Sequence, residues 1–453
     1  MIRGGSGIGK DTPPRHGRGV WPDKRTVDIA GCECLSLWWP GLARGPLHFG
    51  GRTAAAVSLS RLFVSALLVP TPTAPIRLLD LPAQHAAIQA ELDAALQRVL
   101  REGAFIQGPD VQQFADELGQ YLGGAHVIPC ANGTDALQLA LMALDLQPGD
   151  EVIVPAFTYV ATAEAAAILG LKPVLADVDP HTFCLDAAAA EAALTPRTRA
   201  IMAVHLYGQC ADLTALRAVA DKHHLALIED NAQAIGATWQ LPDGTLLPAG
   251  TVGEMGTTSF FPSKNLGALG DGGALLTRSE TRAAQLYELA NHGQQRGKKY
   301  VHQRIGLNSR LDTLQAALLR VKLRHLAAWT SARQQAAAHY DAALAAVPGL
   351  RTPARQPGST HVFHQYTITL DSEVRRDGLQ QHLQAHGIPS VVYYPVPVHT
   401  QPAYQYLGYR AGQFPVAERL CRTVLSLPIH PGLTAEQIDY VAEAVRAFGA
   451  QAC

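Results

Sequence analysis

The sequence predicts an α/β protein whose larger part holds a mostly parallel sheet of seven strands. Seven short apolar runs recur between residues 125 and 277, and helix-like segments such as TDALQLALMAL and DLTALRAVADKH separate most of them. Strands that alternate with helices form βαβ units, so these runs are expected to pair in one sheet. The runs are HVIPC at 126, EVIVPA at 151, KPVLADV at 172, AIMAVHL at 200, LALIED at 225, TTSFF at 257 and GALLT at 273.

The last two runs depart from this rhythm. TTSFF at 257 and GALLT at 273 are too close together to enclose a crossover helix. A parallel pair needs a crossover connection of a dozen or more residues, usually a helix. One of the two runs is therefore expected to pair antiparallel.

The segments on either side of the sheet are predicted to be mainly helical. Residues 78–103 carry apolar residues at helical spacing, and 279–345 form a long helical stretch whose leucines are expected to pack in the core. After about 350, the runs HQYTITL and PSVVYYP indicate short strands again, with helices between. We therefore expect a large domain over 76–335 and a smaller α/β domain over 336–453 that closes over a substrate.

Composition excludes several classes of function. The chain has 453 residues, 47% of them apolar, and its 37 Lys and Arg nearly balance its 38 Asp and Glu. That balance argues against a surface for nucleic acid or for a membrane. The seven cysteines show no C-x-x-C spacing, which favours reduced thiols in a cytoplasm. The alternative is that Cys32 and Cys34 bind a metal ion, but no cluster of His or Cys lies near them in the sequence.

Residues 1–75 differ from the rest in being rich in Gly, Arg, Pro and Trp with little periodicity. GGSGIGKD at 4–11 has the spacing of a phosphate loop, yet Asp11 stands where a magnesium-binding hydroxyl belongs, so a chance match is favoured. LFVSALLV at 62–69 is too short to span a bilayer. This leader is expected to be disordered, or to be translated upstream sequence with the natural start near Val69.

Polar groups follow the strands at the edge where ligands gather in such sheets. ANGTDA follows the first run, FTYVATAE the second, YGQ the fourth, DNAQ the fifth and PSKN the sixth. Within ANGTDA, Gly133 and Thr134 lie between a strand and a helix, where bare N–H groups and a hydroxyl hold a phosphate. The alternative is a helix cap made by Thr134 or Asp135.

Asp230 and Lys264 are the candidate chemical groups at this edge. Asp230 ends an apolar strand and needs a cationic partner, which is either an arginine that the sequence does not identify or a protonated ring nitrogen. Lys264 has no acidic residue within six positions and stands among small residues and glycines. A lysine that bonds to a carbonyl needs such a partly dry site and bare backbone.

These features together describe one cofactor, pyridoxal 5′-phosphate. Lys264 would hold its aldehyde as a Schiff base, and Asp230 would keep the ring protonated as an electron sink. The glycine-rich turn and Ser259 would hold the phosphate. An aromatic side chain at Phe157 or Tyr159 would cover the ring face.

At this point the sequence resembles the DegT/DnrJ/EryC1/StrS sugar aminotransferases over about residues 76–447. The resemblance implies a fold-type I, aspartate aminotransferase-like fold. It also implies L-glutamate as donor, a keto-sugar nucleotide as acceptor, a ping-pong cycle, and a homodimer with active sites at its interface. The motifs that carry it are CANGTDALQLA, PAFTYVATAEA, HLYGQCADL, IEDNAQAIGA, SFFPSKNLGALGDGGAL, NHGQ, GLNSRLDTLQAA and YYPVPVHTQPAY, in the family's order.

The resemblance also implies roles for single residues around the cofactor. Lys264 matches the Schiff-base lysine and Asp230 the acid on the ring nitrogen. Gln233 matches the contact to the ring hydroxyl, and Tyr159 matches the aromatic that stacks on the ring. The phosphate cup corresponds to Gly133, Thr134 and Ser259.

Further matches concern the partner subunit and the substrate. Asn308 matches a residue that reaches a phosphate in the neighbouring subunit's site, and Arg310 looks like part of the substrate pocket of the same neighbour. Tyr393 and Tyr394 match residues of the small domain that line the substrate side. His399, close after them, is equally compatible with a substrate contact and with a structural role.

The branch that the motifs most resemble aminates the 3-keto group of a UDP-linked N-acetylated hexuronic acid in surface polysaccharide synthesis. Arg310 would then meet the uronate carboxylate. Two positions depart from the pattern. Tyr393 stands where that branch has histidine, which bears on the sugar preference, and Asn231 stands where the family has alanine. The Asn231 side chain is expected to point away from the ring.

Retention of Lys264 favours transamination, because relatives that carry histidine there perform dehydration instead. Two alternatives stay open at the level of sequence. One is a pyridoxal phosphate enzyme of another reaction type, a sugar dehydratase or lyase. The other is a non-catalytic regulator that retains the fold.

Overall fold

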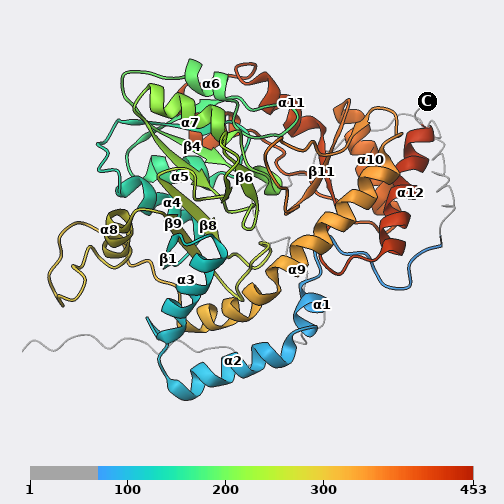
Figure 1. Ribbon diagram of the computed structural model, residues 1–453. Coiled ribbons are helices and arrows are strands. Elements are labelled where there is room, and N and C mark those ends of the chain that lie inside the picture. The colour runs from blue at the N-terminus through green and yellow to red at the C-terminus, as the bar shows by residue number, and fades with distance from the viewer. Residues whose placement is uncertain (1–69, 452–453) are drawn as a thin grey trace, which may run out of the picture. The chain divides into compact units, whose positions relative to one another are not determined.

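The computed structural model of the chain describes residues 70–451 (Figure 1). The interpretations of residues 4–11, of Cys32 and Cys34 and of residues 62–69 therefore lie outside the described residues. The described residues fall within one compact unit. The division into domains at 335 stays a prediction.

The central sheet has seven strands in the order β1-β9-β8-β5-β4-β2-β3, which confirms the seven predicted runs. β9 pairs antiparallel with both β1 and β8, whereas the other neighbours pair in parallel, as expected from the short connection before β9. The strands are β1 (His126–Cys130), β2 (Glu151–Pro155), β3 (Lys172–Ala176), β4 (Thr198–Val204), β5 (Ala226–Asp230), β8 (Met255–Ser259) and β9 (Gly273–Thr277).

Helices pack on this sheet through apolar side chains. α4 contacts β8 and β9, α7 contacts β4 and β5, and α8 contacts β1 and β9. Most buried residues of these strands and helices form one hydrophobic core, and Ala274 and Leu276 of β9 belong to a second with residues of α3 and α9. The helices of this part are α3 (Pro109–Tyr121), α4 (Gly133–Met142), α5 (Ala161–Ile168), α6 (Ala187–Ala192), α7 (Leu213–Lys222) and α8 (Glu280–Ala290).

The prediction of one helix over residues 78–103 is wrong, because two helices occupy this range. α1 (Leu81–Ala86) starts at Asp80, whose side chain accepts from the Ala83 N–H, and α2 (Gln89–Glu102) follows after a break at Ile88. Ile88 leaves the helical conformation and packs with Leu92 against residues of α9. Tertiary packing thus overrides a continuous helical pattern.

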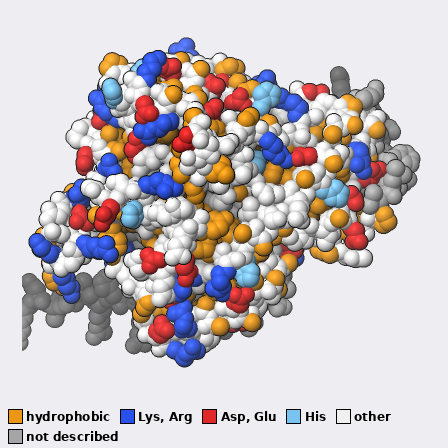
Figure 2. Space-filling model, in the orientation of Figure 1, with side chains coloured by type: hydrophobic (Ala, Val, Ile, Leu, Met, Phe, Trp, Pro, Cys, Tyr) orange, Lys and Arg blue, Asp and Glu red, His pale blue; other side chains and the backbone are white. Residues whose placement is uncertain are grey.

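The helical stretch expected over 279–345 is also interrupted. α8 ends at Ala290, and α9 (Thr313–Leu344) begins only after a segment that doubles back on itself, with bridges joining Gln294 to His302 and Asn291 to Asn308. Gly293 permits this reversal, because a Cβ there would lie 1.8 Å from the Arg304 carbonyl oxygen. Figure 2 shows Lys and Arg side chains gathered over this segment, at the left of the view.

α9 is the longest helix and crosses the described part of the chain diagonally in Figure 1. It packs against α2 and α3 near its start and against α12 near its end. The leucines of α9 are largely buried, as the sequence predicted. α9 thus links the seven-stranded sheet to the C-terminal elements.

The C-terminal elements centre on a small antiparallel sheet, β10-β11-β12. HQYTITL forms β11 as predicted, but PSVVYYP forms no strand, and only Val391 bridges to Ser426. A hairpin, β6 with β7, was not predicted from the sequence. The elements are β6 (Thr238–Gln240), β7 (Leu246–Pro248), β10 (Leu350–Arg351), β11 (Tyr366–Leu370), β12 (Val424–Leu427), α10 (Glu373–Ala385), α11 (Pro415–Thr423) and α12 (Ala435–Gln451).

No helix within residues 70–451 is both long enough and apolar enough to cross a membrane.

Candidate active site

The candidate site lies where β5 and β8 end side by side. Asp230, the last residue of β5, pairs with Thr257 of β8, and Ser259 ends β8 two residues later. The loop that carries Lys264 starts directly after Ser259. Because the two strands are parallel, their carboxyl ends bring Asp230 and this loop to the same edge of the sheet.

Asp230 is 6% exposed, and no described arginine or lysine forms an ion pair with it. Its Oδ2 accepts a hydrogen bond of 2.9 Å from the Thr162 hydroxyl, and its Oδ1 accepts one of 3.2 Å from the Ala232 N–H. A buried carboxylate without a cation is costly. The arrangement therefore leaves room for a cationic group from a ligand.

Lys264 supplies an amine close to that carboxylate. The residue is partly buried, and its side chain makes no hydrogen bond or ion pair with any described residue. Burial lowers the pKa of Lys264 to about 8, although the nearby Asp230 raises it. A lysine in this state has a sizeable neutral fraction near pH 7, as a nucleophilic amine requires.

Gln233 connects the end of β5 to the C-terminal part of the chain. Its Oε1 accepts from the Tyr207 N–H at 2.7 Å, and its Nε2 donates to the Tyr394 hydroxyl at 3.0 Å. The Tyr207 hydroxyl in turn donates to the Tyr393 carbonyl. Burial raises the pKa of Tyr394, with Asp230 adding to the effect, so its hydroxyl stays protonated.

Gly133 and Thr134 open α4 directly beside Ser259. A Cβ on Gly133 would lie 2.7 Å from the Ser259 Cβ, so only glycine permits this contact. The helix is capped by Asn132, whose Oδ1 accepts from the Asp135 N–H at 2.8 Å, and not by Thr134 or Asp135. The N–H groups of Gly133 and Thr134 therefore have no partner within the helix and can bind an anion.

Tyr159 lies at the open side of the site. Its side chain is 58% exposed, and its ring is tilted by 41° against that of Tyr394 at 6.0 Å. The two tyrosines line a cavity of about 150 Å³ together with Thr158 and Val396. An exposed ring here is available to cover a flat ligand.

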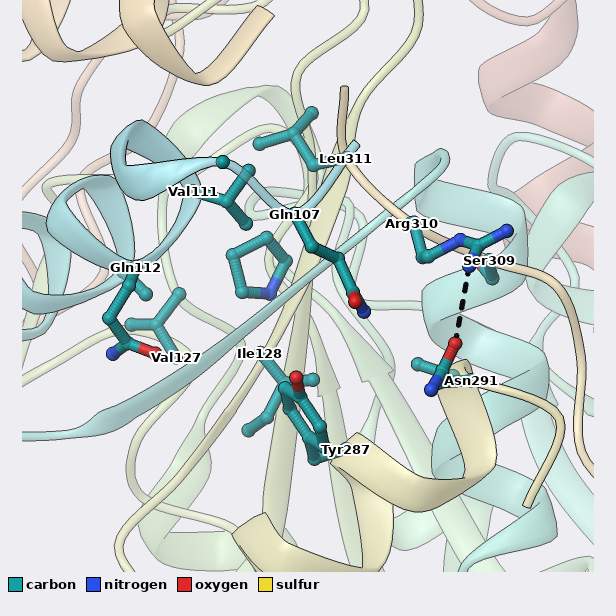
Figure 3. A pocket seen from close by; sticks show the side chains of 14 residues that line it. Gln107, Val111, Gln112, Val127, Ile128, Tyr287, Asn291, Ser309, Arg310 and Leu311 are labelled. Atoms are coloured by element: carbon teal, nitrogen blue, oxygen red, sulfur yellow. Dashed lines mark hydrogen bonds between the residues drawn. The ribbon is translucent and has the colours of Figure 1, made fainter. Parts of the chain in front are cut away.

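Among the described residues, neither Asn308 nor Arg310 forms a hydrogen bond or ion pair with Lys264, Asp230 or Gln233. Asn308 is exposed, and the Arg310 guanidinium donates to Asn291 Oδ1 at 3.3 Å. Arg310 lines a separate cavity of about 100 Å³ between α3, β1 and α8, which Figure 3 shows with the side chain of Tyr287 at its side. Ser309, which lies between these two residues, accepts a hydrogen bond of 3.1 Å from the Ala131 N–H, two residues before Gly133.

Three residues of the site were not singled out from the sequence. Thr162 binds Asp230, and Asn265 follows Lys264 and accepts a hydrogen bond of 3.1 Å from His364 Nδ1. Burial, with Lys264 and Arg333 nearby, holds the pKa of His364 well below its usual value, so its ring is neutral. The position of Thr162 at the start of a helix after β2 was a usable signal, whereas His364 is distant in sequence and gave none.

Burial and hydrogen bonds also bear on His399, whose role the sequence left open, and on Asn231, whose orientation it predicted. His399 is 2% exposed and its Nε2 pairs with Glu418 at 3.0 Å, which favours the structural role. Asn231 is fully buried, and its Nδ2 donates to the Ala249 carbonyl at 3.0 Å. Its side chain therefore points away from Lys264 and Asp230, as expected.

The residues present fit pyridoxal phosphate. Among the described residues, Asp230 forms no ion pair, Lys264 has a lowered pKa, and the N–H groups of Gly133 and Thr134 lie beside Ser259 without a partner in α4. These features match a protonated ring nitrogen, an aldehyde and a phosphate, respectively. No group of three or more His, Cys, Asp or Glu in residues 70–451 is placed to hold a metal ion.

Comparison with known proteins identifies the chain as a member of an aminotransferase family. Residues 86–446 match the DegT/DnrJ/EryC1/StrS aminotransferase family. The chain is 45% identical over 370 residues to UDP-2-acetamido-2-deoxy-3-oxo-D-glucuronate aminotransferase of Pseudomonas aeruginosa, which covers 82% of this chain and 99% of the relative.

Solved structures resemble the fold closely. DesV of S. venezuelae has a TM-score of 0.79 and 43% identity, covering 83% of this chain and 99% of its own. NtdA from Bacillus subtilis, solved with the bound cofactor PMP, has a TM-score of 0.75 and 33% identity, covering 83% of each chain.

Proposed function

Because the chain belongs to the DegT/DnrJ/EryC1/StrS aminotransferase family, we propose that it moves the amino group of L-glutamate to a keto-sugar nucleotide, with pyridoxal 5′-phosphate as cofactor. One observation carries the proposal. Lys264, with its pKa lowered to about 8, lies close to Asp230, a buried carboxylate that forms no ion pair with any described arginine or lysine. This pair suits a cofactor that joins an amine to a protonated ring.

Each part of the cofactor has a proposed binding group. Lys264 would hold the aldehyde, Asp230 the ring nitrogen and Gln233 the ring hydroxyl, while Tyr159 would cover the ring. The phosphate would be bound by Gly133, Thr134 and Ser259. When bound, pyridoxal phosphate supplies an electron sink that stabilises negative charge on the carbon next to the amine nitrogen.

The chain's own residues would bind, orient and move protons. The neutral Nζ of Lys264 takes the proton from the α-carbon of glutamate and returns one to the sugar carbon that receives nitrogen, acting as general base and acid. The Thr162 hydroxyl fixes the Asp230 carboxylate at 2.9 Å. Gln233, held by the Tyr207 N–H, keeps the Tyr394 hydroxyl in place beside the reacting groups.

We further propose that the active enzyme is a homodimer with a composite site. Asn308 would reach the phosphate, and Arg310 the substrate, of the partner's site. Among the described residues, neither forms a hydrogen bond or ion pair with Lys264 of its own chain, which supports this proposal. The exposed apolar side chains of Phe105, Ile106 and Ile305 support it too. The cytoplasmic location stays a prediction.

The proposed acceptor is the 3-keto group of a UDP-linked N-acetylated hexuronate. The Pseudomonas aeruginosa relative, named for such a sugar, supports this choice. Arg310 offers a cation for the uronate carboxylate. Tyr393 and Tyr394 would line the sugar, and Tyr393 is the position most able to shift the preference among sugars.

The test is a panel of keto-sugar nucleotides offered with L-glutamate, with release of 2-oxoglutarate as the readout. We expect stoichiometric release with a UDP-linked 3-keto sugar, fastest for the uronate. Release with a different keto sugar would correct the substrate alone. Elimination of water without oxoglutarate would instead establish the dehydratase alternative.

A further inference from the structure

Two cations are buried on one face of α9. Lys322 is 1% exposed and Arg333 is 3% exposed. They stand eleven residues apart, which is about three turns of an α-helix, so both side chains leave the helix on the same side. Neither forms an ion pair with any carboxylate of the described residues, although buried cations are ordinarily paired.

Lys322 binds the loop that carries Lys264. Its ammonium donates to the Gly267 carbonyl and to His85 Nε2, the latter at 3.0 Å. Burial lowers the pKa of Lys322 to about 8, so the amine is still mostly charged at neutral pH. Burial and Lys322 together lower the pKa of His85, which keeps its ring neutral and able to accept.

Backbone hydrogen bonds and a close backbone approach constrain the loop between Gly267 and Lys264. The Ala268 N–H donates to the Phe260 carbonyl at 2.7 Å, which closes the loop, and the Lys264 N–H donates to the Phe261 carbonyl at 2.8 Å. A Cβ on Gly267 would lie 2.3 Å from the Pro262 carbonyl oxygen. A displacement at Gly267 would therefore shift the backbone of Lys264, three residues away.

Arg333 is linked to the same loop indirectly, through the segment that contains Val362 and Phe363. Its Nη1 donates to the carbonyls of Phe363 at 3.1 Å and Ile429 at 3.0 Å. The neighbours of Phe363 bind Asn265, whose Nδ2 donates to the Val362 carbonyl at 3.1 Å. Asn265 directly follows Lys264, so Arg333 fixes the second anchor of the loop.

We propose that Lys322 and Arg333 are positioning residues. Through them α9 fixes the backbone of the Lys264 loop, and this orients the Lys264 amine for the proposed cofactor. A cation that binds carbonyl groups makes stronger hydrogen bonds than a neutral donor. Because α9 also packs against α2, α3 and α12, it offers both cations a rigid support. The inference rests on the proposed role of Lys264.

The test compares Lys322→Met and Arg333→Met with a matched control, Arg324→Met. Arg324 lies on the same helix, is 58% exposed and pairs with Glu91 instead of the loop. Amide hydrogen exchange of residues 259–270 is measured in the cofactor-free chain, and the dissociation constant for pyridoxal phosphate is measured by fluorescence. We expect faster exchange and about ten-fold weaker binding for the two test variants, the loss of one charge-assisted hydrogen bond.

Arg333→Lys keeps a cation that can reach one carbonyl, so it should recover part of the affinity that Arg333→Met loses. If Lys322→Met does not fold, His85→Leu takes its place, because it removes one hydrogen-bond acceptor of Lys322. The comparison of Arg333→Lys with Arg333→Met then still tests the inference. Wild-type exchange and affinity in the folded variants, or an equal loss in Arg324→Met, would overturn the inference. Failure of the wild type itself to bind pyridoxal phosphate would instead overturn the proposed function.

Discussion

Two opposing influences set the pKa of the Lys264 amine. Burial lowers its pKa to about 8, and Asp230 limits the decrease. With that pKa about one tenth of the amine is neutral at pH 7, some hundreds of times more than for an ordinary lysine. The position of Lys264 therefore gives its amine a larger neutral fraction than an ordinary lysine has, as its proposed role requires.

The rate at which the cofactor-free protein captures pyridoxal phosphate should follow this pKa. We expect the rate to rise with pH up to a midpoint near 8 and to level off above it, because the neutral amine reacts. Asp230→Asn removes the raising influence and should move the midpoint to lower pH. Stopped-flow absorbance measures both profiles. A midpoint at the ordinary value of lysine in the wild type would contradict this reading.

The Thr162 hydroxyl should matter because it binds Asp230, the acid that we propose meets the ring nitrogen. Thr162→Val keeps the shape but removes the 2.9 Å hydrogen bond to Asp230. We expect a loss of about 1 kcal/mol in cofactor binding, or several-fold in the dissociation constant. Thr330→Val is the matched control, since the buried hydroxyl of Thr330 has no hydrogen-bond partner within residues 70–451 and its removal should cost no affinity. Equal behaviour of the two variants would argue against the role of Thr162.

At the scale of elements, the site depends on how closely α4 approaches the end of β8. Gly273 of β9 pairs with both Cys130 of β1 and Ser259 of β8, which brings the start of α4 beside Ser259. A sheet whose antiparallel strand lies between two others thus builds the proposed phosphate cup. The cup requires glycine at 133, where α4 touches Ser259.

Gly133→Ala should damage both stability and cofactor binding. The added methyl would lie 2.7 Å from the Ser259 Cβ, and overpacking of this kind costs about 1–3 kcal/mol. Gly432→Ala is the control, because the nearest atom to its added methyl is the His430 Nδ1 at 3.7 Å. Thermal unfolding and equilibrium dialysis with pyridoxal phosphate measure the two effects. A Gly133→Ala variant with unchanged affinity would show that the phosphate binds elsewhere.

The elements that the sequence predicted well are those whose signal is local. Each strand of the seven-stranded sheet is a short apolar run between turn residues, and the antiparallel pairing of β9 follows from the length of its connection. The sequence did not predict the break at Ile88, which depends on packing against α9. It wrongly predicted a strand at PSVVYYP, where only Val391 forms a bridge. Such contacts join residues far apart in sequence and leave no periodic pattern.

The candidate site shows the same division. Asp230, Lys264 and Gly133 stand out as a charged group or a glycine at a strand end, and the structure brings the first two together. His364 and Lys322 escaped notice because each touches the Lys264 loop only in the folded chain. Lys322 in particular reads as an ordinary residue of a helix.

At the scale of the whole molecule, the proposed homodimer predicts that two defective chains can restore each other. Lys264→Ala lacks the reactive amine, and a variant with Asn308→Ala and Arg310→Ala lacks the proposed contribution to the partner's site. Each should be inactive alone. Mixed dimers contain one site with all groups intact, so aminotransferase activity should reappear after subunit exchange. No recovery, although mixed dimers form, would place Asn308 and Arg310 in their own chain's chemistry or outside it.

The most direct test of the central claim is to reduce the protein with borohydride after incubation with pyridoxal phosphate and to map the modified peptide by mass spectrometry. We predict a single phosphopyridoxyl group on Lys264, and none in Lys264→Ala, while Lys222→Ala, which alters an exposed lysine paired with Glu191, remains fully labelled. Labelling of another lysine, or of none, would contradict the assignment of Lys264 as the amine that holds the cofactor.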